Sequence, residues 1–175
     1  MKTVEHWAGG GVLHGTSNRT APLFDPARGL QTGQVSLASA SEVDEVVKSS
    51  VETSAAWRES PLGRRTDMLF RLRELLVNNR HELASLITAE HGKVLSDADG
   101  EVARGLECVE FACGIPQLLK GSHSSEVSTG VDVHTILEPV GVVAGITPFN
   151  FPVMVPLCMM ANAIACGNTF ILKPS

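Results

Sequence analysis

The chain has 175 residues, and its 14 Lys and Arg against 19 Asp and Glu give a formal net charge of −5. This acidic balance, with a pI of about 5.6, argues against a nucleic-acid-binding protein, which would carry a basic stripe. Because 43% of the residues are hydrophobic, the chain is too apolar to be disordered and is long enough for one globular domain.

The cysteines and histidines give no sign of a disulfide scaffold or a metal site. There is no CxxC pair, so we expect each cysteine to be a small, buried, apolar residue in a reducing compartment, and none to be a nucleophile. The six histidines lack metal-ligand spacing. The first ten residues lack the features of a secretion signal or a transit peptide, so we expect a cytoplasmic location. The four cysteines are Cys108, Cys113, Cys158 and Cys166.

The first elements in chain order are short strands and then a helix. Residues 7–18 are rich in glycine and polar side chains, which predicts short strands joined by loops. Ser39, with Glu42 three residues later, forms a capping box, and valines recur at helical spacing from there to Trp57. These signals predict a helix that begins directly after Ser39.

Three further helices are predicted between residues 60 and 116. Ser60 before Pro61 fits an N-cap with proline at the first helical position. A short third helix ends at Gly92, which can adopt the left-handed conformation. Ser96 can cap the fourth helix, which has one apolar face. A neighbouring face of that helix carries Glu101, Arg104, Cys108 and Phe111.

The last third of the chain predicts a hairpin arm and a βαβ unit. Apolar and polar residues alternate over 131–135, as in a half-buried strand of a hairpin. Residues 140–146 are continuously apolar, as in a parallel strand covered on both faces. Residues 153–165 have the length of a helix, and residues 169–172 form a second short strand. This order predicts a right-handed crossover between two parallel strands.

No charged residue lies between Glu138 and Lys173, so a membrane segment is an alternative reading of this run. Pro148, Pro152 and Pro156 interrupt it, and we therefore favour the buried elements of a sheet. Two parallel strands cannot form a stable sheet alone, which leads us to expect a truncated chain.

Three side chains are candidates for a functional site. Ligands of open α/β sheets bind beyond the carboxyl ends of the strands. Asn150 lies there, and its neutral amide could stabilise developing negative charge or simply cap the helix that follows. Lys173 ends the second strand and could reach a ribose or phosphate, or be a solvated lysine. Arg104 could hold a carboxylate with two hydrogen bonds, or be an ordinary surface arginine.

Three stretches resemble the aldehyde dehydrogenase superfamily. They are EPVGVVAGITPFNFP at residues 138–152, ACGNTFILKPS at 165–175 and TAEHGK at 88–93. The CoA-acylating methylmalonate or malonate semialdehyde dehydrogenases are the subfamily that the chain resembles in detail. This resemblance rests on Phe149, residues 153–157 and residues 101–107. The similarity runs along essentially the whole chain, but it covers only the N-terminal part of a family member.

The resemblance implies an α/β fold, the N-terminal part of an aldehyde dehydrogenase-type Rossmann-like domain with a helical layer, a β-hairpin arm and one βαβ unit. Residues 1–122 would be the strands and helices that open the NAD-binding domain. Residues 123–138 would be a bridging arm for oligomerisation. Residues 139–175 would be the first βαβ unit of the NAD-binding sheet.

The resemblance also implies NAD-dependent oxidation of a small semialdehyde by an enzyme cysteine, with coenzyme A as co-substrate and loss of carbon dioxide. Asn150 resembles the oxyanion donor, Thr147 and Phe149 resemble residues that line the cofactor, and Lys173 resembles the lysine that reaches the adenine ribose. Arg104 resembles an arginine that holds the substrate carboxylate. The implied assembly is a homo-oligomer, without metal, nucleic acid or membrane.

The family's catalytic cysteine would lie beyond Ser175, so the chain alone is expected to be inactive. Two alternatives stay open at this point. The first is a hydrolytic NAD(P)-dependent aldehyde dehydrogenase, in which water releases the acyl group. The second is a short protein that binds or assembles without catalysis.

Overall fold

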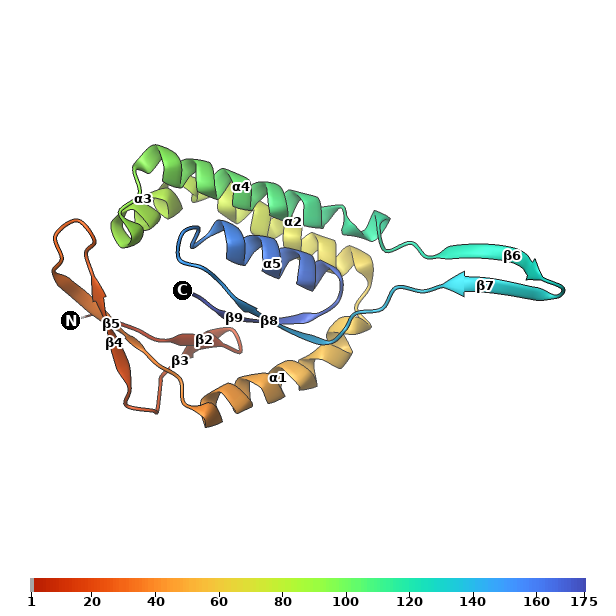
Figure 1. Cartoon of the computed structure of the whole chain (residues 1–175), viewed down its shortest axis with the longest axis horizontal. Coiled ribbons are helices and arrows are strands. Elements are labelled where there is room, and N and C mark those ends of the chain that lie inside the picture. Colours follow the sequence, from red (N-terminus) through yellow and green to blue (C-terminus); the bar gives the residue numbers. More distant parts are fainter. Residues whose placement is uncertain (1) are drawn as a thin grey trace.

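A computed structural model describes residues 2–175 (Figure 1). Its first part consists of five short strands in two small sheets. β2 (His6–Ala8) and β3 (Gly11–Leu13) form an antiparallel hairpin. β5 (Gln31–Ser36) is parallel to β1 (Lys2–Val4) on one side and antiparallel to β4 (Thr20–Phe24) on the other. The predicted short strands joined by loops are confirmed.

Helix α1 (Ala40–Arg58) begins with the predicted capping box. The Glu42 carboxylate accepts hydrogen bonds from the backbone N–H of Ser39 at 2.7 Å and of Thr16 at 2.6 Å. Hydrogen bonds to the charged form stabilise it, so these two amides lower the pKa of Glu42 to about 2. The same carboxylate therefore caps α1 and ties it to the N-terminal strands.

Helix α2 (Leu62–Asn78) begins one residue later than predicted, because Pro61 is its N-cap and Ser60 does not cap it. The Ser60 hydroxyl instead donates to the Trp57 carbonyl at 2.6 Å and accepts from Arg65 Nε at 3.3 Å. Arg65 is buried and also donates to the Arg58 carbonyl at 2.5 Å. The Ser60 side chain therefore contributes to the contact between α1 and α2 and not to the start of α2.

Helix α3 (Arg80–His91) ends as predicted, with Gly92 in the left-handed conformation at φ 82°. Helix α4 (Leu95–Cys113) begins before Ser96, whose side chain makes no cap. The Val94 carbonyl accepts from the N–H groups of Asp97 and Ala98, so Val94 is the N-cap and the helix begins two residues earlier than a cap at Ser96 predicts. The short 3₁₀ helix η1 (Ile115–Gln117) follows.

The hydrophobic core lies where α2, α4 and α5 (Met154–Ala165) meet. Small residues allow α4 and α5 to approach closely, since a Cβ on Gly105 would lie 2.8 Å from Leu157 Cδ1. A second cluster joins α3 to α4. Buried members of the first cluster include Leu69, Leu76, Val109, Ala112, Ile115, Leu157, Ala161 and Ala165.

Strands β6 (Ser122–Ser128) and β7 (Val131–Thr135) form an antiparallel hairpin that extends away from the rest of the molecule (Figure 1). The predicted strand and hairpin are therefore confirmed. The predicted half-burial is wrong, because every residue of both strands is exposed. The hairpin has no described element against either face, so alternating apolar residues here mark an uncovered surface.

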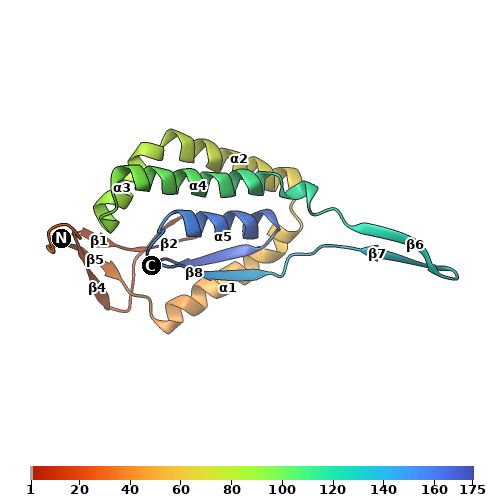
Figure 2. The same cartoon turned by 45° about the horizontal axis from the view of Figure 1, so that its top comes forward.

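The predicted βαβ unit is confirmed as β8 (Val142–Ile146), α5 and β9 (Thr169–Lys173), with parallel strands. Helix α5 lies between this strand pair and the layer of α2 and α4, while α1 lies on the other side (Figure 2). Within β8 only Gly145 is buried, so the prediction that this strand is covered on both faces is wrong. No third strand joins the pair in the described chain.

No helix among residues 2–175 is both long and apolar enough to cross a bilayer.

Candidate active site at the end of the βαβ unit

The two strands of the βαβ unit end side by side. Ile146 pairs with Lys173, and the Thr147 N–H donates to the Lys173 carbonyl at 3.2 Å. The structure thus brings together two of the residues that the sequence singled out, at the strand edge where ligands of α/β sheets bind.

These two residues present groups that fit a dinucleotide. The Thr147 side chain is almost fully buried, and its hydroxyl has no hydrogen-bond partner within the described residues. A buried hydroxyl without a partner is uncommon, and a polar ligand group at the strand end would satisfy it. The Lys173 side chain is exposed and ends in a cationic donor suited to a ribose hydroxyl or a phosphate. The residues present therefore fit NAD.

Asn150 does not cap the following helix. Helix α5 starts at Met154 with Val153 as its N-cap, and no side chain of its own segment caps it. The alternative in which Asn150 is only a helix cap is therefore excluded. The Asn150 side chain is exposed, and no residue in the described range 2–175 hydrogen-bonds to its amide. Phe149 beside it is 76% exposed, so both predicted positions face outward from the loop.

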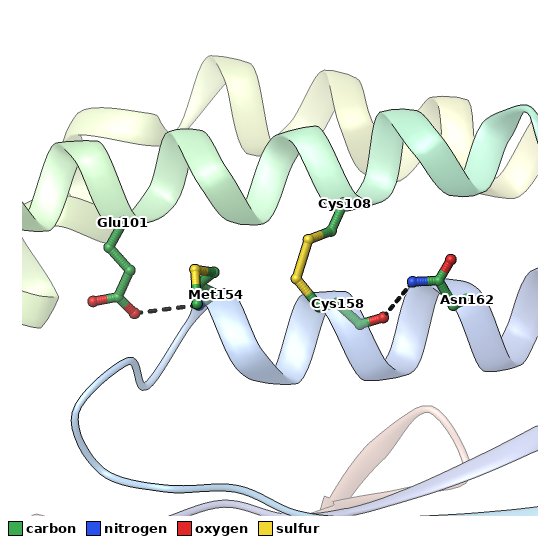
Figure 3. The surroundings of a disulfide bond; sticks show 5 residues. All are labelled: Glu101, Cys108, Met154, Cys158 and Asn162. Carbon is green, nitrogen blue, oxygen red and sulfur yellow. Dashed lines mark hydrogen bonds between the residues drawn. A yellow bond between two sulfur atoms is a disulfide. The ribbon is translucent and has the colours of Figure 1, made fainter.

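The first amides of α5 are satisfied by a residue from another helix. Glu101 of α4 accepts from the Val153 N–H at 2.8 Å and from the Met154 N–H at 3.2 Å. Figure 3 shows the second of these hydrogen bonds. Its side chain is fully buried. A carboxylate at this position also interacts favourably with the positive end of the helix dipole. Helical periodicity placed Glu101 and Arg104 on one face of this helix but did not predict the role of Glu101. The available signal was an acidic residue one position before the inward-facing Val102.

Arg104 lies on α4, three residues after Glu101, and its side chain is exposed. No hydrogen bond or ion pair within residues 2–175 involves it. Nor does a hydrogen bond or ion pair among the described residues connect it to Thr147, Asn150 or Lys173. Its predicted grip on a substrate carboxylate stays a prediction.

The expectation that all four cysteines are reduced is wrong. Cys108 of α4 and Cys158 of α5 form a disulfide, with a sulfur–sulfur distance of 2.02 Å (Figure 3). The helices pack side by side, which brings together two cysteines that are 50 positions apart in the sequence. Cys113 and Cys166 are free and half-buried. Burial raises the pKa of the Cys113 thiol, which keeps it protonated and unreactive.

No group of side chains in the described part of the chain could hold a metal ion. The site is instead the end of a parallel βαβ unit, with an outward-facing amide and a lysine at the strand edge. This arrangement defines the chain as part of an α/β protein, with its candidate site at the strand edge where ligands of such sheets bind.

The family follows from comparison with known proteins. Residues 13–175 match the model of the aldehyde dehydrogenase family. The chain therefore belongs to the aldehyde dehydrogenase family. The resemblance identified from its motifs and the expected fold are confirmed.

Named relatives are similar to nearly the whole chain. Malonate-semialdehyde dehydrogenase 2 of Geobacillus thermodenitrificans is 48% identical over 174 residues, which are 99% of this chain and 36% of the relative. Malonate-semialdehyde dehydrogenase of Pseudomonas aeruginosa is 45% identical over 175 residues, 100% of this chain and 35% of the relative. The chain thus spans little more than a third of the length of these relatives.

Two solved structures are similar to the whole of this chain. A methylmalonate-semialdehyde dehydrogenase from Oceanimonas doudoroffii is 46% identical with a TM-score of 0.96, and the match covers 100% of this chain and 36% of that one. A provisionally named methylmalonate-semialdehyde dehydrogenase of Sinorhizobium meliloti, solved as a complex with NAD, is 43% identical with the same TM-score and coverage.

Proposed function

We propose that these residues are the N-terminal part of an NAD-dependent, CoA-acylating semialdehyde dehydrogenase. The reaction converts methylmalonate or malonate semialdehyde to propionyl-CoA or acetyl-CoA with loss of carbon dioxide. The observation that carries the proposal is an identity of 41–48%, along 98–100% of this chain, to relatives named malonate-semialdehyde dehydrogenase.

Three residues at the strand edge bind and orient the cofactor in this proposal. Lys173 donates to hydroxyls of the adenine ribose, and Thr147 and Phe149 line the cofactor. The unpartnered Thr147 hydroxyl and the exposed Lys173 ammonium support these roles. NAD, when bound, supplies the acceptor for the hydride that leaves the aldehyde carbon.

Asn150 stabilises the oxygen of the substrate. A cysteine thiolate outside these residues bonds to the aldehyde carbon, and the carbonyl oxygen takes up the negative charge. The Asn150 amide then donates a hydrogen bond to that oxygen. Such donors act best when they are fixed before the reaction and are not used elsewhere. The outward-facing amide of Asn150, which caps no helix, supports this role.

Arg104 selects substrates that carry a carboxylate. A guanidinium can hold a carboxylate through two parallel hydrogen bonds, which a simple aldehyde cannot accept. The exposed Arg104 guanidinium, free of any hydrogen bond or ion pair to the described residues, supports this role. The acyl group then leaves on the thiol of coenzyme A, which restores the enzyme thiol.

The 175 residues alone are inactive in this proposal, because the nucleophilic cysteine belongs to the part of the family fold that they do not contain. The exposed hairpin β6–β7 pairs subunits in a homo-oligomer. Its exposed valines, 46–53% accessible, support this role, and light scattering of the complete protein tests it. A cytoplasmic location stays a prediction, and the disulfide weighs against it.

The proposal is tested by substrate choice. The protein from the complete reading frame should form NADH from malonate semialdehyde and, less well, from propanal. Arg104→Ala should raise KM for the carboxylated substrate far more than for propanal, since only the former loses a paired charge. Arg64→Ala, which removes an exposed arginine of α2, is the matched control. Equal effects of Arg104→Ala on both substrates would remove Arg104 from the substrate site.

A further inference from the structure

Two side chains of opposite charge meet beneath the loop that carries Asn150. Lys93 precedes α4, and its Nζ lies 2.6 Å from Glu101 Oε2. The side chains are 12% and 0% exposed, so this ion pair is shielded from solvent. A shielded pair of this kind does more to fix one geometry than a surface pair, because neither charge can turn to water.

Both partners also bind the loop. The Lys93 ammonium donates to the backbone carbonyl of Asn150 at 2.9 Å and lies 4.5 Å from the ring centre of Phe151. Glu101 uses its other oxygen to accept from the N–H groups of Val153 and Met154. One ion pair therefore holds residues 150 to 154 at both ends.

We propose that Lys93 and Glu101 are positioning residues for the Asn150 amide. The inference rests on the proposed function, in which that amide stabilises the substrate oxygen. Lys93 fixes the backbone of Asn150, Glu101 fixes the start of α5, and the ion pair between them sets the distance between the two attachments. Neither residue contacts the substrate; both act by holding the amide where the negative charge develops.

These attachments allow the loop to present the exposed Asn150 side chain on a fixed backbone. The far end of the loop is fixed by the hydrogen bond between Thr147 and Lys173, so the segment is held on both sides of Asn150. A catalytic donor has to stay within about 0.5 Å of its productive position, and a displacement of about 1 Å can cost 10²-fold in rate. Loss of one attachment should therefore reduce the turnover number more than the affinity for substrate.

The test is a cycle of variants in the complete protein. Lys93→Gln should lower kcat about 10- to 10²-fold with KM for NAD little changed. In the Asn150→Ala background the same change should have almost no effect, because the amide that Lys93 positions is already gone. A merely structural role would give the same loss in both backgrounds, and that result would overturn the proposal.

Two further variants address folding and specificity. Lys93→Gln leaves the buried Glu101 carboxylate without its partner, which could destabilise the fold. The double variant Lys93→Gln, Glu101→Gln removes both charges, and it should show the same loss of kcat as Lys93→Gln alone. The control is Arg80→Gln, which breaks an ion pair between α3 and α4 whose side chains are 40% and 45% exposed. Among the described residues Arg80 hydrogen-bonds only to Asp99 and to no residue of the loop, so its variant should keep full turnover.

Hydrogen exchange separates this inference from the proposed function. Lys93→Gln should speed amide exchange at Asn150, Phe151, Val153 and Met154, and Arg80→Gln should not. This measurement needs no turnover. If the protein oxidises no aldehyde, the proposed function is refuted, but the exchange rates still show whether Lys93 holds the loop. Equal exchange rates in the two variants would overturn the inference.

Discussion

Breaking the Cys108–Cys158 disulfide should destabilise the protein strongly. The bond links positions 50 residues apart, which belong to two helices of the main core. Closing a loop of this length removes about 14 cal/mol/K of entropy from the unfolded chain, or about 4 kcal/mol at 25 °C, which is an upper value for the stabilisation. Residual structure in the unfolded chain lowers the measured figure.

The assay is urea unfolding of one protein sample, with and without a thiol reductant, so that the sequence stays constant. The midpoint should fall on reduction, and Cys108→Ser with Cys158→Ser should unfold near the midpoint of the reduced protein. Cys113→Ser is the control, because Cys113 is a free cysteine and its variant should keep the response to reductant. Equal midpoints with and without reductant would refute the reasoning, as would non-reducing peptide mapping that finds both cysteines free.

Three other perturbations test an acidic contact, a glycine and the candidate donor. The Ser39 and Thr16 amides lower the Glu42 pKa from 4.5 to about 2, so the stabilisation is present above pH 4.5 and is lost as the pH falls toward 2. Glu42→Gln should therefore lower the melting temperature near neutral pH, and the melting temperatures of variant and wild type should converge in acid. A difference in melting temperature that stays constant with pH would contradict this. Glu45→Gln is the control. Gly167→Ala should lower the unfolding free energy by about 1–2 kcal/mol because its φ is positive, and by more because the new Cβ would lie 2.7 Å from Arg65 Nη1. Gly29→Ala, whose Cβ would meet open space, should lose only the ~1–2 kcal/mol that comes from φ. Urea unfolding measures both. Asn150→Ala should lower kcat about 10²-fold or more, and a loss of NAD affinity alone would instead give Asn150 a structural role.

Local signals predicted much of the fold. The capping box at Ser39, the left-handed stop at Gly92 and the βαβ unit are encoded within short stretches, and the structure confirms each. The caps predicted at Ser60 and Ser96 were wrong, because a serine before a helix can make hydrogen bonds other than a cap. The Ser60 hydroxyl binds the end of α1, and the backbone of α4 begins its own hydrogen bonding before Ser96.

The contacts that build the site could not be predicted, because they join distant segments. Glu101 meets the start of α5 and Cys108 meets Cys158 only once α4 packs against α5, and helical periodicity does not say which helices will pair. The pattern of the hairpin strand predicted a covered face, but a strand's neighbours decide its burial. By contrast, the βαβ pattern predicted that the residues after β8 and at the end of β9 share one edge, because adjacent parallel strands present their carboxyl ends on the same side of a sheet.

CoA-dependent oxidation of a carboxylated semialdehyde can be measured as NADH formation from malonate semialdehyde by the complete protein, with and without coenzyme A. We expect sustained turnover that requires coenzyme A, with acetyl-CoA and carbon dioxide as products, and no turnover by the 175 residues alone. Sustained turnover without coenzyme A would contradict the claim and place the protein among the hydrolytic aldehyde dehydrogenases.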